Sequence, residues 1–456
     1  MKLGSLIITA SVFGSATVSA FVPPSAGVQH TATANSRVSS LLKSSMAGVQ
    51  GGVINLNDEY AQRDVYGMEQ WALGFGVQKA AGVELASSDG QDWQLVAQQN
   101  MPAGSPVLFV PAQLIMSSNN IAQEFGNSIS QAEQVLVQSD RGTAQRLPLF
   151  RLMVKVLAEY EKGQQSPYFP WLNSLPRIFY NGVAMTDACF DCLPPYAALL
   201  SMNERNTYSR FVNAIRKGYM PLRPDTINDD KVVKWAYNVA LTRFHEVWQP
   251  TRQKYLIPMA DMFNHNTNPN VELTFDQQGN CVVNTMNNVQ AGSPLTISLG
   301  DPTNPTPIFA KYGFLYDDCK TIFCKAIHLE KEIEELGFNF RDLLFQTETG
   351  EIAPHVWDLF LYKVLKDNDP NAANQFMVAV KTNDGAAQQQ FQNNYFPYAV
   401  QALKEHVGGI LNDVNQLTMK AQSYDLNTHP RVPVIVAHNN LVRDTFTMTL
   451  ALLQKY

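Results

Sequence analysis

The chain has 456 residues, of which 45% are hydrophobic and 16% are charged, and its formal net charge is −6. This composition predicts a globular protein with enough apolar residues for two or three domains, and it excludes global disorder. The negative net charge argues against general nucleic-acid binding, which requires a basic surface to displace counterions.

The first 55 residues have the composition of a targeting sequence. A lysine at position 2, an apolar run at 6–12 and the small residues Val18-Ser19-Ala20 predict a signal peptide over 1–20. The apolar run is too short to span a bilayer, which takes about 20 residues. Residues 21–55 are rich in Ser, Thr and Ala and contain no acidic residue, which is typical of a transit peptide. This two-part leader resembles the plastid address of algae with complex plastids and predicts the chloroplast stroma; a secretory signal before a disordered linker, in a secreted or endomembrane protein, is the alternative.

Two early segments have the composition of strands. Residues 94–97 and 101–111 are rich in apolar residues, and the second contains the turn sequence Ala103-Gly104-Ser105-Pro106. Together they predict two strands around a tight turn.

The middle of the chain has helical periodicity. Residues 133–162 carry an apolar stripe of helical spacing, and we expect a break at Pro148. The aromatic and proline-rich segment 166–176 is excluded from a helix interior, because proline lacks the backbone N–H that a helix needs. Further helical sequence ends in 232–244.

Short strands follow. Residues 271–275 alternate apolar and polar side chains, 276–280 predict a turn, and 281–283 predict the returning strand. Residues 295–299 predict another strand, and the proline-rich residues 301–307 predict a loop.

Beyond Leu329 the sequence is mostly helical. Three apolar stripes of helical spacing need one another for burial, so they predict a helical bundle. The stripes are Trp357, Phe360, Leu361, Val364 and Leu365; Val400, Leu403, Val407, Ile410, Val414 and Leu417; and Val442, Phe446, Leu450 and Leu453. We expect the loop 427–433 to join the last two helices.

Five cysteines are too few for a disulfide framework in a chain of this length. Cys189 and Cys192 form one close pair, and Cys319 and Cys324 form a wider one. We expect reduced cysteines and no metal, with a four-thiolate zinc site as the alternative.

Four segments, in order along the chain, resemble the signature motifs of SET-domain methyltransferases of the plant Rubisco large-subunit lysine methyltransferase subfamily. The segments are Ser166 to Pro176, Trp235-Ala236 with Thr242-Arg243-Phe244, Pro258 to His265, and Tyr312-Gly313-Phe314. The resemblance covers roughly residues 68 to 456.

The resemblance implies an α+β fold in which a β-rich SET domain with a helical insertion is followed by an all-α C-terminal domain. The implied parts are the N-terminal part of the SET domain at 56–118, the insertion at 119–234, the C-terminal part of the SET domain at 235–328, and a helical substrate-binding domain at 329–456.

The implied activity is S-adenosylmethionine-dependent protein-lysine N-methylation of a plastid protein. Lysine has an ordinary pKa of about 10.4, so such a site must favour the neutral amine by desolvation. Most of the rate then comes from alignment of the amine nitrogen with the methyl group and the sulfur.

By resemblance, Asn264 and His265 hold the cofactor, Arg243 lies at its carboxylate, and Asp261 lies close by. Read without the surrounding motif, Asn264-His265 is a turn with a core histidine. Arg243 has the alternatives of pairing with Glu246 at the surface or with Asp261 in the core.

By resemblance, Tyr312 is catalytic, and Tyr312, Phe314 and Thr242 line the substrate channel. Active members of the family carry a tyrosine where this chain has Leu299. Loss of one positioned hydroxyl costs about 2–4 kcal/mol of transition-state stabilisation. Tyr312, Tyr316 and Tyr255 are candidates to supply it.

The N-terminal cofactor loop departs from the family's G-x-G-x-x-A pattern as well. Trp93 and Gln94 place side chains where the backbone of the family approaches the cofactor.

The resemblance implies a protein substrate, and stromal enzymes such as the Rubisco large subunit or a plastid aldolase are candidates. We expect no nucleic-acid partner, no stable membrane insertion and a monomer. Two alternatives are a SET-fold protein that has lost catalysis and binds partner proteins through its C-terminal helices, and an enzyme that methylates histidine, whose imidazole is neutral near pH 7.

Overall fold

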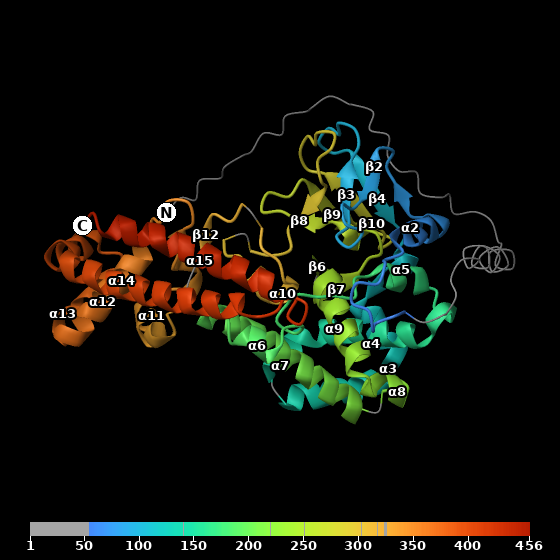
Figure 1. Cartoon of the computed structure of the whole chain (residues 1–456), viewed down its shortest axis with the longest axis horizontal. Helices are drawn as coiled ribbons and strands as arrows, with labels where there is room; N and C mark the ends of the chain where they lie inside the picture. The colour runs from blue at the N-terminus through green and yellow to red at the C-terminus, as the bar shows by residue number, and fades with distance from the viewer. Residues whose placement is uncertain are drawn as a thin grey trace, which may run out of the picture.

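The computed structural model describes residues 54–456, except residues 140, 219, 250, 302, 317 and 323–325. The expected signal peptide at 1–20 and nearly all of the transit segment at 21–55 therefore lie outside the described residues. Figure 1 shows a part that contains most strands and the central helices, with a bundle of C-terminal helices beside it along the long axis. Within the described ranges, no helix is long and apolar enough to cross a membrane.

The strands form several small sheets. The largest has four antiparallel strands in the order β1-β4-β10-β9. The predicted hairpin is confirmed as β9 and β10, and the alternating burial of β10 shows that one of its faces packs on the core. The strands of this part are β1 (Gln78–Lys79), β2 (Val83–Ala86), β3 (Gln94–Ala97), β4 (Pro106–Val110), β5 (Met116–Ser117), β6 (Phe244–Gln249), β7 (Thr251–Leu256), β8 (Asn264–His265), β9 (Val271–Phe275), β10 (Cys281–Thr285) and β11 (Thr296–Ile297).

The two early strands exist as β3 and β4, but the prediction that they flank one turn is wrong in its pairing. β3 pairs with β2, whereas β4 lies between β1 and β10. The chain does not turn back onto β3. It continues to Met101, which pairs with Val289. The partners of β4 are distant in the sequence, so local periodicity carries no information about them.

Helices surround the strands, and α3, α4 and α7 to α9 lie together below the sheets in Figure 1. The helices of this part are α2 (Val65–Gly74), α3 (Ser118–Ser139), α4 (Leu147–Glu161), α5 (Phe169–Ser174), α6 (Asp187–Phe190), α7 (Pro195–Lys217), α8 (Pro224–Asn228), α9 (Asp230–Arg243) and α10 (Thr306–Tyr312). Short 3-10 turns occur at Ala112–Leu114, Arg141–Arg146, Gly163–Gln165, Ala260–Met262, Ile327–Leu329 and Phe340–Asp342.

Two predictions about proline are corrected by the structure. The helix was expected to break at Pro148, but it breaks earlier, at the 3-10 turn Arg141–Arg146 between α3 and α4. Pro148 itself occupies the first turn of α4. The segment 166–176 contains the short helix α5, with Pro170 in its first turn. The first turn has no intrahelical acceptor for a backbone N–H, so proline is accepted there.

The strand and loop expected at 295–307 are shorter than predicted. Only Thr296–Ile297 form a strand, β11, and it pairs in parallel with β8. The loop ends at Pro305, where α10 begins.

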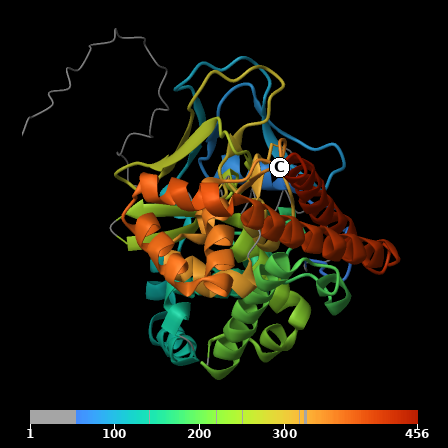
Figure 2. The same ribbon diagram turned by 90° about the vertical axis from the view of Figure 1, so that its left-hand side faces the viewer.

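The C-terminal part is a helical bundle, as its apolar stripes predicted, and α14 packs along α15. Phe376, Leu403, Val407 and Phe446 are fully buried in its core. Figure 2 shows these helices in front of the remaining chain. Its elements are β12 (Thr321–Ile322), β13 (Phe345–Gln346), α11 (Glu330–Leu336), α12 (Pro354–Asn368), α13 (Pro370–Lys381), α14 (Gly385–Gln422) and α15 (Val432–Leu453). The connection between the last two helices starts earlier than the predicted loop 427–433.

Helix α15 holds the two parts of the molecule together. Just before it, Arg431 forms an ion pair with Glu59, with 2.6 Å between Nη2 and Oε1. His438 lies 3.1 Å from the hydroxyl of Thr306 at the start of α10, measured from Nε2. Asn439 donates a hydrogen bond of 3.0 Å to the carbonyl of Cys192.

His438 makes the stability of this junction sensitive to acid. Its side chain is 2% exposed, and burial lowers its pKa from 6.5 to about 4. The folded chain therefore keeps it neutral, whereas the unfolded chain takes up a proton below about pH 6.5. We expect the free energy of unfolding to fall by up to about 3 kcal/mol from this residue as the pH falls from 7 to 4.

Urea unfolding at pH 7.5, 6 and 5 tests this expectation. His438→Gln is expected to reduce the loss of stability on acidification, whereas His355→Gln, at an exposed position, is expected to leave it unchanged. Equal pH dependence in the wild type and His438→Gln would contradict the assignment.

Candidate active site

The parallel pairing of β8 with β11 brings two sequence motifs together. Thr296 lies opposite Asn264, and Ile297 lies opposite His265. The side chain of Asn270 fixes the crossing, because it accepts from the backbone N–H of Thr296 at 2.8 Å and donates to the carbonyl of Pro294 at 2.9 Å. The segment 258–265 and the segment that ends at Leu299 are thus held side by side.

His265 is bonded directly to the backbone of Leu299. The N–H of Leu299 donates to Nδ1 of His265 at 3.0 Å, which places the ring proton on Nε2 in the neutral form. Nε2 is buried and has no hydrogen-bond partner within the part of the chain that the structure describes. Burial lowers the pKa of His265, which favours this neutral ring.

Tyr312 meets Leu299 from the other side. Its hydroxyl lies 3.4 Å from the carbonyl of Leu299, to which it donates, and accepts from the Lys311 amine at 2.8 Å. Burial raises the pKa of the Tyr312 phenol above its ordinary value, so the hydroxyl keeps its proton.

Aromatic rings extend the site around this contact. The ring of Phe314 is 6.0 Å from that of Tyr312 and 6.1 Å from that of His265, and Tyr316 packs edge-on against His265 at 5.0 Å. We call these four residues the aromatic wall. The hydroxyl of Tyr255 is engaged elsewhere, with Gln253 at 3.0 Å.

The turn that carries Tyr312 is fixed by its neighbours. Gly313 ends α10 with φ of 82°, and the side chain of Asn181 donates 3.0 Å hydrogen bonds to the carbonyl of Lys311 and to Asn238. The backbone N–H of Gly182 donates to the carbonyl of Ala310 at 2.9 Å. The insertion therefore sets the position of the Tyr312 side chain.

A charged cluster surrounds Asp261, in the middle of the segment 258–265. Asp261 is 5% exposed, and its Oδ2 accepts from the indole N–H of Trp171 at 3.1 Å. Arg243 donates from Nη1 to the carbonyl of Asp261 at 2.9 Å. Of the two alternatives for Arg243, the contact is with Asp261, although through its backbone; Glu246 pairs with Lys254 at 3.1 Å.

Two polar atoms of the charged cluster point to a ligand. Oδ1 of Asp261 and Nε of Arg243 are buried, and neither has a hydrogen-bond partner among the described residues. Burial raises the pKa of Asp261, against the charge of Arg243 and the bond from Trp171. An unused acceptor and an unused donor in a buried site are costly unless a bound molecule engages them.

Arg63 belongs to this cluster too. It donates to the carbonyl of Ser174 at 2.7 Å and to the carbonyl of Gln91. Burial, together with the neighbouring charge of Arg243, lowers its pKa to about 9.

Thr242 and the unusual loop residues have structural contacts. Thr242 donates its hydroxyl to the carbonyl of Asn238 within α9 at 2.8 Å. Trp93 donates to the carbonyl of Gly90 at 3.0 Å and packs edge-on on Tyr66 at 5.2 Å. The bulky indole of Trp93 is thus buried in the core, and half-buried Gln94 begins β3.

Cys189, Cys192, Cys281 and Cys319 are buried and free, as expected for reduced core cysteines. Across the described residues, no group of three or more His, Cys, Asp and Glu side chains is arranged to hold a metal ion. Cys324, the remaining member of the alternative zinc site, lies outside the described residues.

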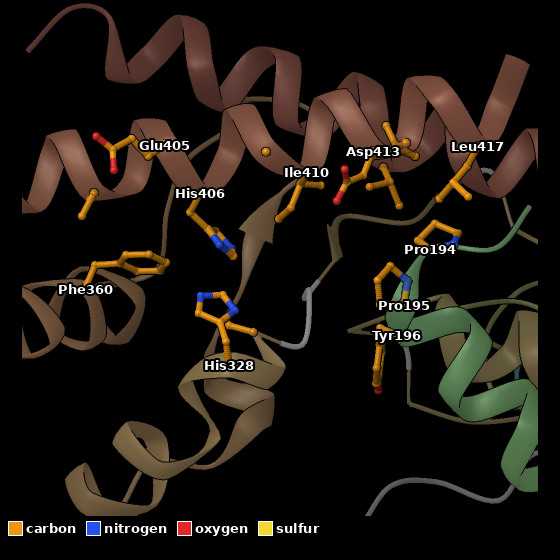
Figure 3. Close-up of a pocket in the computed structure, with 15 residues that line it drawn as sticks. Pro194, Pro195, Tyr196, His328, Phe360, Glu405, His406, Ile410, Asp413 and Leu417 are labelled. Atoms are coloured by element: carbon orange, nitrogen blue, oxygen red, sulfur yellow. The ribbon is translucent and has the colours of Figure 1, made fainter.

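A cleft of about 710 Å³ lies between the C-terminal bundle and the start of α7 (Figure 3). His406 on α14 and His328 face each other, with 5.7 Å between ring centroids. Glu405 and Asp413 add acidic groups to a lining that is otherwise mainly apolar, and Pro194 and Pro195 close the opposite side.

Sequence reasoning missed the roles of Arg63, Trp171 and Lys311. Trp171 stands inside a recognised motif, but its bond to Asp261 joins residues 90 positions apart. Lys311 directly precedes the motif Tyr312-Gly313-Phe314, and this position is the signal that could have identified it. Arg63 lies before the region of resemblance, and no pattern distinguishes it.

Comparison with known proteins agrees with this architecture. Residues 92–300 match the SET domain family. The fold is similar to the crystal structure of the SET domain of LSMT bound to lysine and AdoHcy, with a TM-score of 0.58, 13% identity, and coverage of 86% of this chain and 91% of that chain. It is also similar to the structure of Rubisco LSMT bound to AdoMet, with a TM-score of 0.57, 14% identity, and coverage of 86% and 92%. The comparison with curated proteins found no match. The predicted α+β fold with a C-terminal helical part is confirmed.

Proposed function

We propose that this chain, which contains a SET domain of the LSMT-like fold, is an S-adenosylmethionine-dependent protein-lysine N-methyltransferase. One observation carries the proposal. Leu299 donates its N–H to His265 and accepts at its carbonyl from Tyr312, so the two motifs of the sequence meet at one residue. The LSMT structures of similar fold hold AdoMet, or lysine with AdoHcy.

The residues present fit such a cofactor. S-adenosylmethionine carries a carboxylate, an ammonium group and a methyl group made electrophilic by the sulfonium. The unused Nε of Arg243 is a donor for a carboxylate, and the unused Oδ1 of Asp261 is an acceptor for an ammonium group. Asn264 and His265 are the further residues that would hold it, beside the charged cluster.

The aromatic wall provides the chemistry that a lysine acceptor needs. A site lined by Tyr312 and Phe314 desolvates an amine and disfavours its charged form. The hydroxyl of Tyr312 keeps its proton and donates a hydrogen bond to the Leu299 carbonyl, so its oxygen can accept a hydrogen bond from an amine N–H. It already accepts in this way from Lys311. Tyr312 therefore orients the amine, and Phe314 and Thr242 belong to the channel beside it.

Tyr312 supplies a hydroxyl group close to position 299, where the family has a tyrosine and this chain has leucine. Its hydroxyl contacts the backbone of Leu299. The side chain of Leu299 supplies no second hydroxyl. We expect Leu299→Tyr to raise kcat for a protein substrate about tenfold or more, because one added hydrogen bond to the amine stabilises the transition state by at least about 1.4 kcal/mol. Single-turnover rates with labelled methyl donor measure this. An unchanged or lower rate in a folded Leu299→Tyr chain would show that position 299 does not limit the rate.

The proposal also includes the part of the chain that binds the protein substrate and the cellular location of the enzyme. We assign substrate binding to the C-terminal helices at 329–456, where Glu405 and Asp413 in the mainly apolar cleft at α14 suit a segment with apolar and basic side chains. The leader at 1–55 assigns the enzyme to the chloroplast stroma, and a stromal enzyme is the expected substrate. A fluorescent fusion of residues 1–55 that is secreted or stays in the endomembrane system without reaching the plastid would overturn the location.

Isothermal titration with S-adenosylmethionine and with its demethylated product tests the function. We expect micromolar binding by the wild type, loss of binding in Asn264→Ala, and unchanged binding in Asn268→Ala, a matched exposed position. Transfer of labelled methyl groups to stromal extract, followed by peptide mapping, then identifies the modified residue. Absence of binding by a folded chain would overturn the enzyme assignment in favour of a partner-binding protein, and label on histidine would overturn lysine as the target.

A further inference from the structure

A lysine of this chain already lies at the proposed site. Lys311, in the last turn of α10, extends over the neighbouring Tyr312. Its Nζ is 2.8 Å from the Tyr312 hydroxyl and 4.5 Å from the centre of that ring. The ring of Phe244, which directly follows Arg243, lies 4.1 Å from the same nitrogen. The amine of Lys311 thus stands between two aromatic rings, at the hydroxyl assigned to the acceptor amine.

The charges around Lys311 do not favour an ammonium ion. Glu204 on α7 and Glu246 on β6 act on it from a distance, but each is held by another cation, Arg146 at 2.9 Å and Lys254 at 3.1 Å. Burial, together with the positive charge of Lys254, lowers the pKa of Lys311 to about 7. Near neutral pH a large fraction of Lys311 is therefore the uncharged amine.

We propose that Lys311 is a methyl acceptor, modified in cis by the site that it occupies. The proposal rests on the proposed function. An acceptor lysine must be desolvated, uncharged and next to the tyrosine hydroxyl, and Lys311 meets each requirement within the fold. Because the amine and the site belong to the same chain, methyl transfer to Lys311 requires no association with another chain.

The reaction balances with the methyl donor of the proposed function. The lone pair of Nζ forms a bond to the methyl carbon while the bond between that carbon and sulfur breaks. Sulfur keeps the bonding electron pair and becomes a thioether, so the positive charge passes from sulfur to nitrogen. The methylammonium product returns to the neutral state by releasing one proton to solvent.

Peptide mapping by mass spectrometry tests the proposal on the full chain. The chain is incubated with S-adenosylmethionine that carries a deuterated methyl group, at pH 7 and pH 8.5. We expect label on the peptide that contains Lys311, no label there in Lys311→Arg, and the same fraction labelled per unit time after tenfold dilution. Lys254 is the matched control, because it stacks on the same Phe244 ring at 3.5 Å but is paired with Glu246.

The outcomes separate this inference from the proposed function. A wild-type chain that binds S-adenosylmethionine and labels another protein but leaves Lys311 unmodified overturns the inference alone. A folded chain that neither binds the donor nor acquires label overturns both. Labelling of Lys254 and Lys311 to the same extent would indicate non-selective modification and would also overturn the inference about Lys311.

A second measurement needs no methyl donor. In a chain labelled with ¹³C at the ε-carbon of lysine, the NMR signal lost in Lys311→Arg is expected to titrate with a midpoint near pH 7. A midpoint near the ordinary lysine value of about 10.4 would overturn the premise that the amine is uncharged at neutral pH.

Discussion

Tyr312→Phe is expected to lower kcat about 100-fold or more while the dissociation constant for S-adenosylmethionine stays within about threefold of the wild type. The substitution removes only the hydroxyl that lies between the Leu299 carbonyl and a lysine amine. The ring remains to fill its place beside Phe314. Leu299 offers no side-chain hydroxyl to replace it, and the loss corresponds to about 2–4 kcal/mol of transition-state stabilisation.

Tyr255→Phe is the matched control for this measurement. It also removes one tyrosine hydroxyl, but that hydroxyl donates to Gln253 on the same strand. Single-turnover methyl transfer and calorimetric titration are measured for both variants. A Tyr312→Phe enzyme with the kcat of Tyr255→Phe would exclude Tyr312 from the reaction.

Gly313→Ala is expected to lower the free energy of unfolding by about 4 kcal/mol or more. Gly313 has φ of 82°, where an L-residue with a Cβ costs roughly 1–2 kcal/mol. A Cβ would also lie against the carbonyl carbon of Tyr180 and 2.5 Å from the backbone nitrogen of Asn181. Backbone atoms cannot rotate away as a side chain does, so the turn that carries Tyr312 must move or the chain must fail to fold.

Gly337→Ala separates the two contributions. Gly337 ends α11 with φ of 74°, and a Cβ there would meet no atom within 4 Å. We expect a loss of about 1 kcal/mol from conformation alone. Urea unfolding of both variants gives the comparison, with circular dichroism to recognise a chain that does not fold. Equal losses would show that the approach of Tyr180 to Gly313 has no energetic consequence.

Apolar periodicity predicted the helices that depend on one buried face. The stripes on α12, α14 and α15 were visible because each helix hides one side in the bundle. The predictions at Pro148 and Pro170 were wrong, because the sequence shows a proline but not whether it falls in the first turn of a helix. The local hairpin of β9 and β10 was predictable, but the pairing of β4 was not, because β4 meets Cys281 of β10 far along the chain.

The residues of the candidate site were likewise predictable from the sequence only in part. The residues of the motifs were identified by resemblance, and the structure brings His265, Leu299 and Tyr312 into contact. Trp171 and Arg63 were missed because their roles come from burial against distant groups. Such contacts do not recur at a fixed spacing along the sequence, so only the folded structure shows them.

Helix α15 has a consequence for the biogenesis of the protein. It is synthesised after every segment that it fastens: Glu59 near the start of the described chain, Cys192 in the insertion, and Thr306 at the base of the helix that carries Tyr312. During translation α10 therefore lacks this anchor until α15 has left the ribosome. We infer that, under the proposed function, competence to transfer methyl groups requires α15 to have emerged from the ribosome and is not acquired gradually during translation.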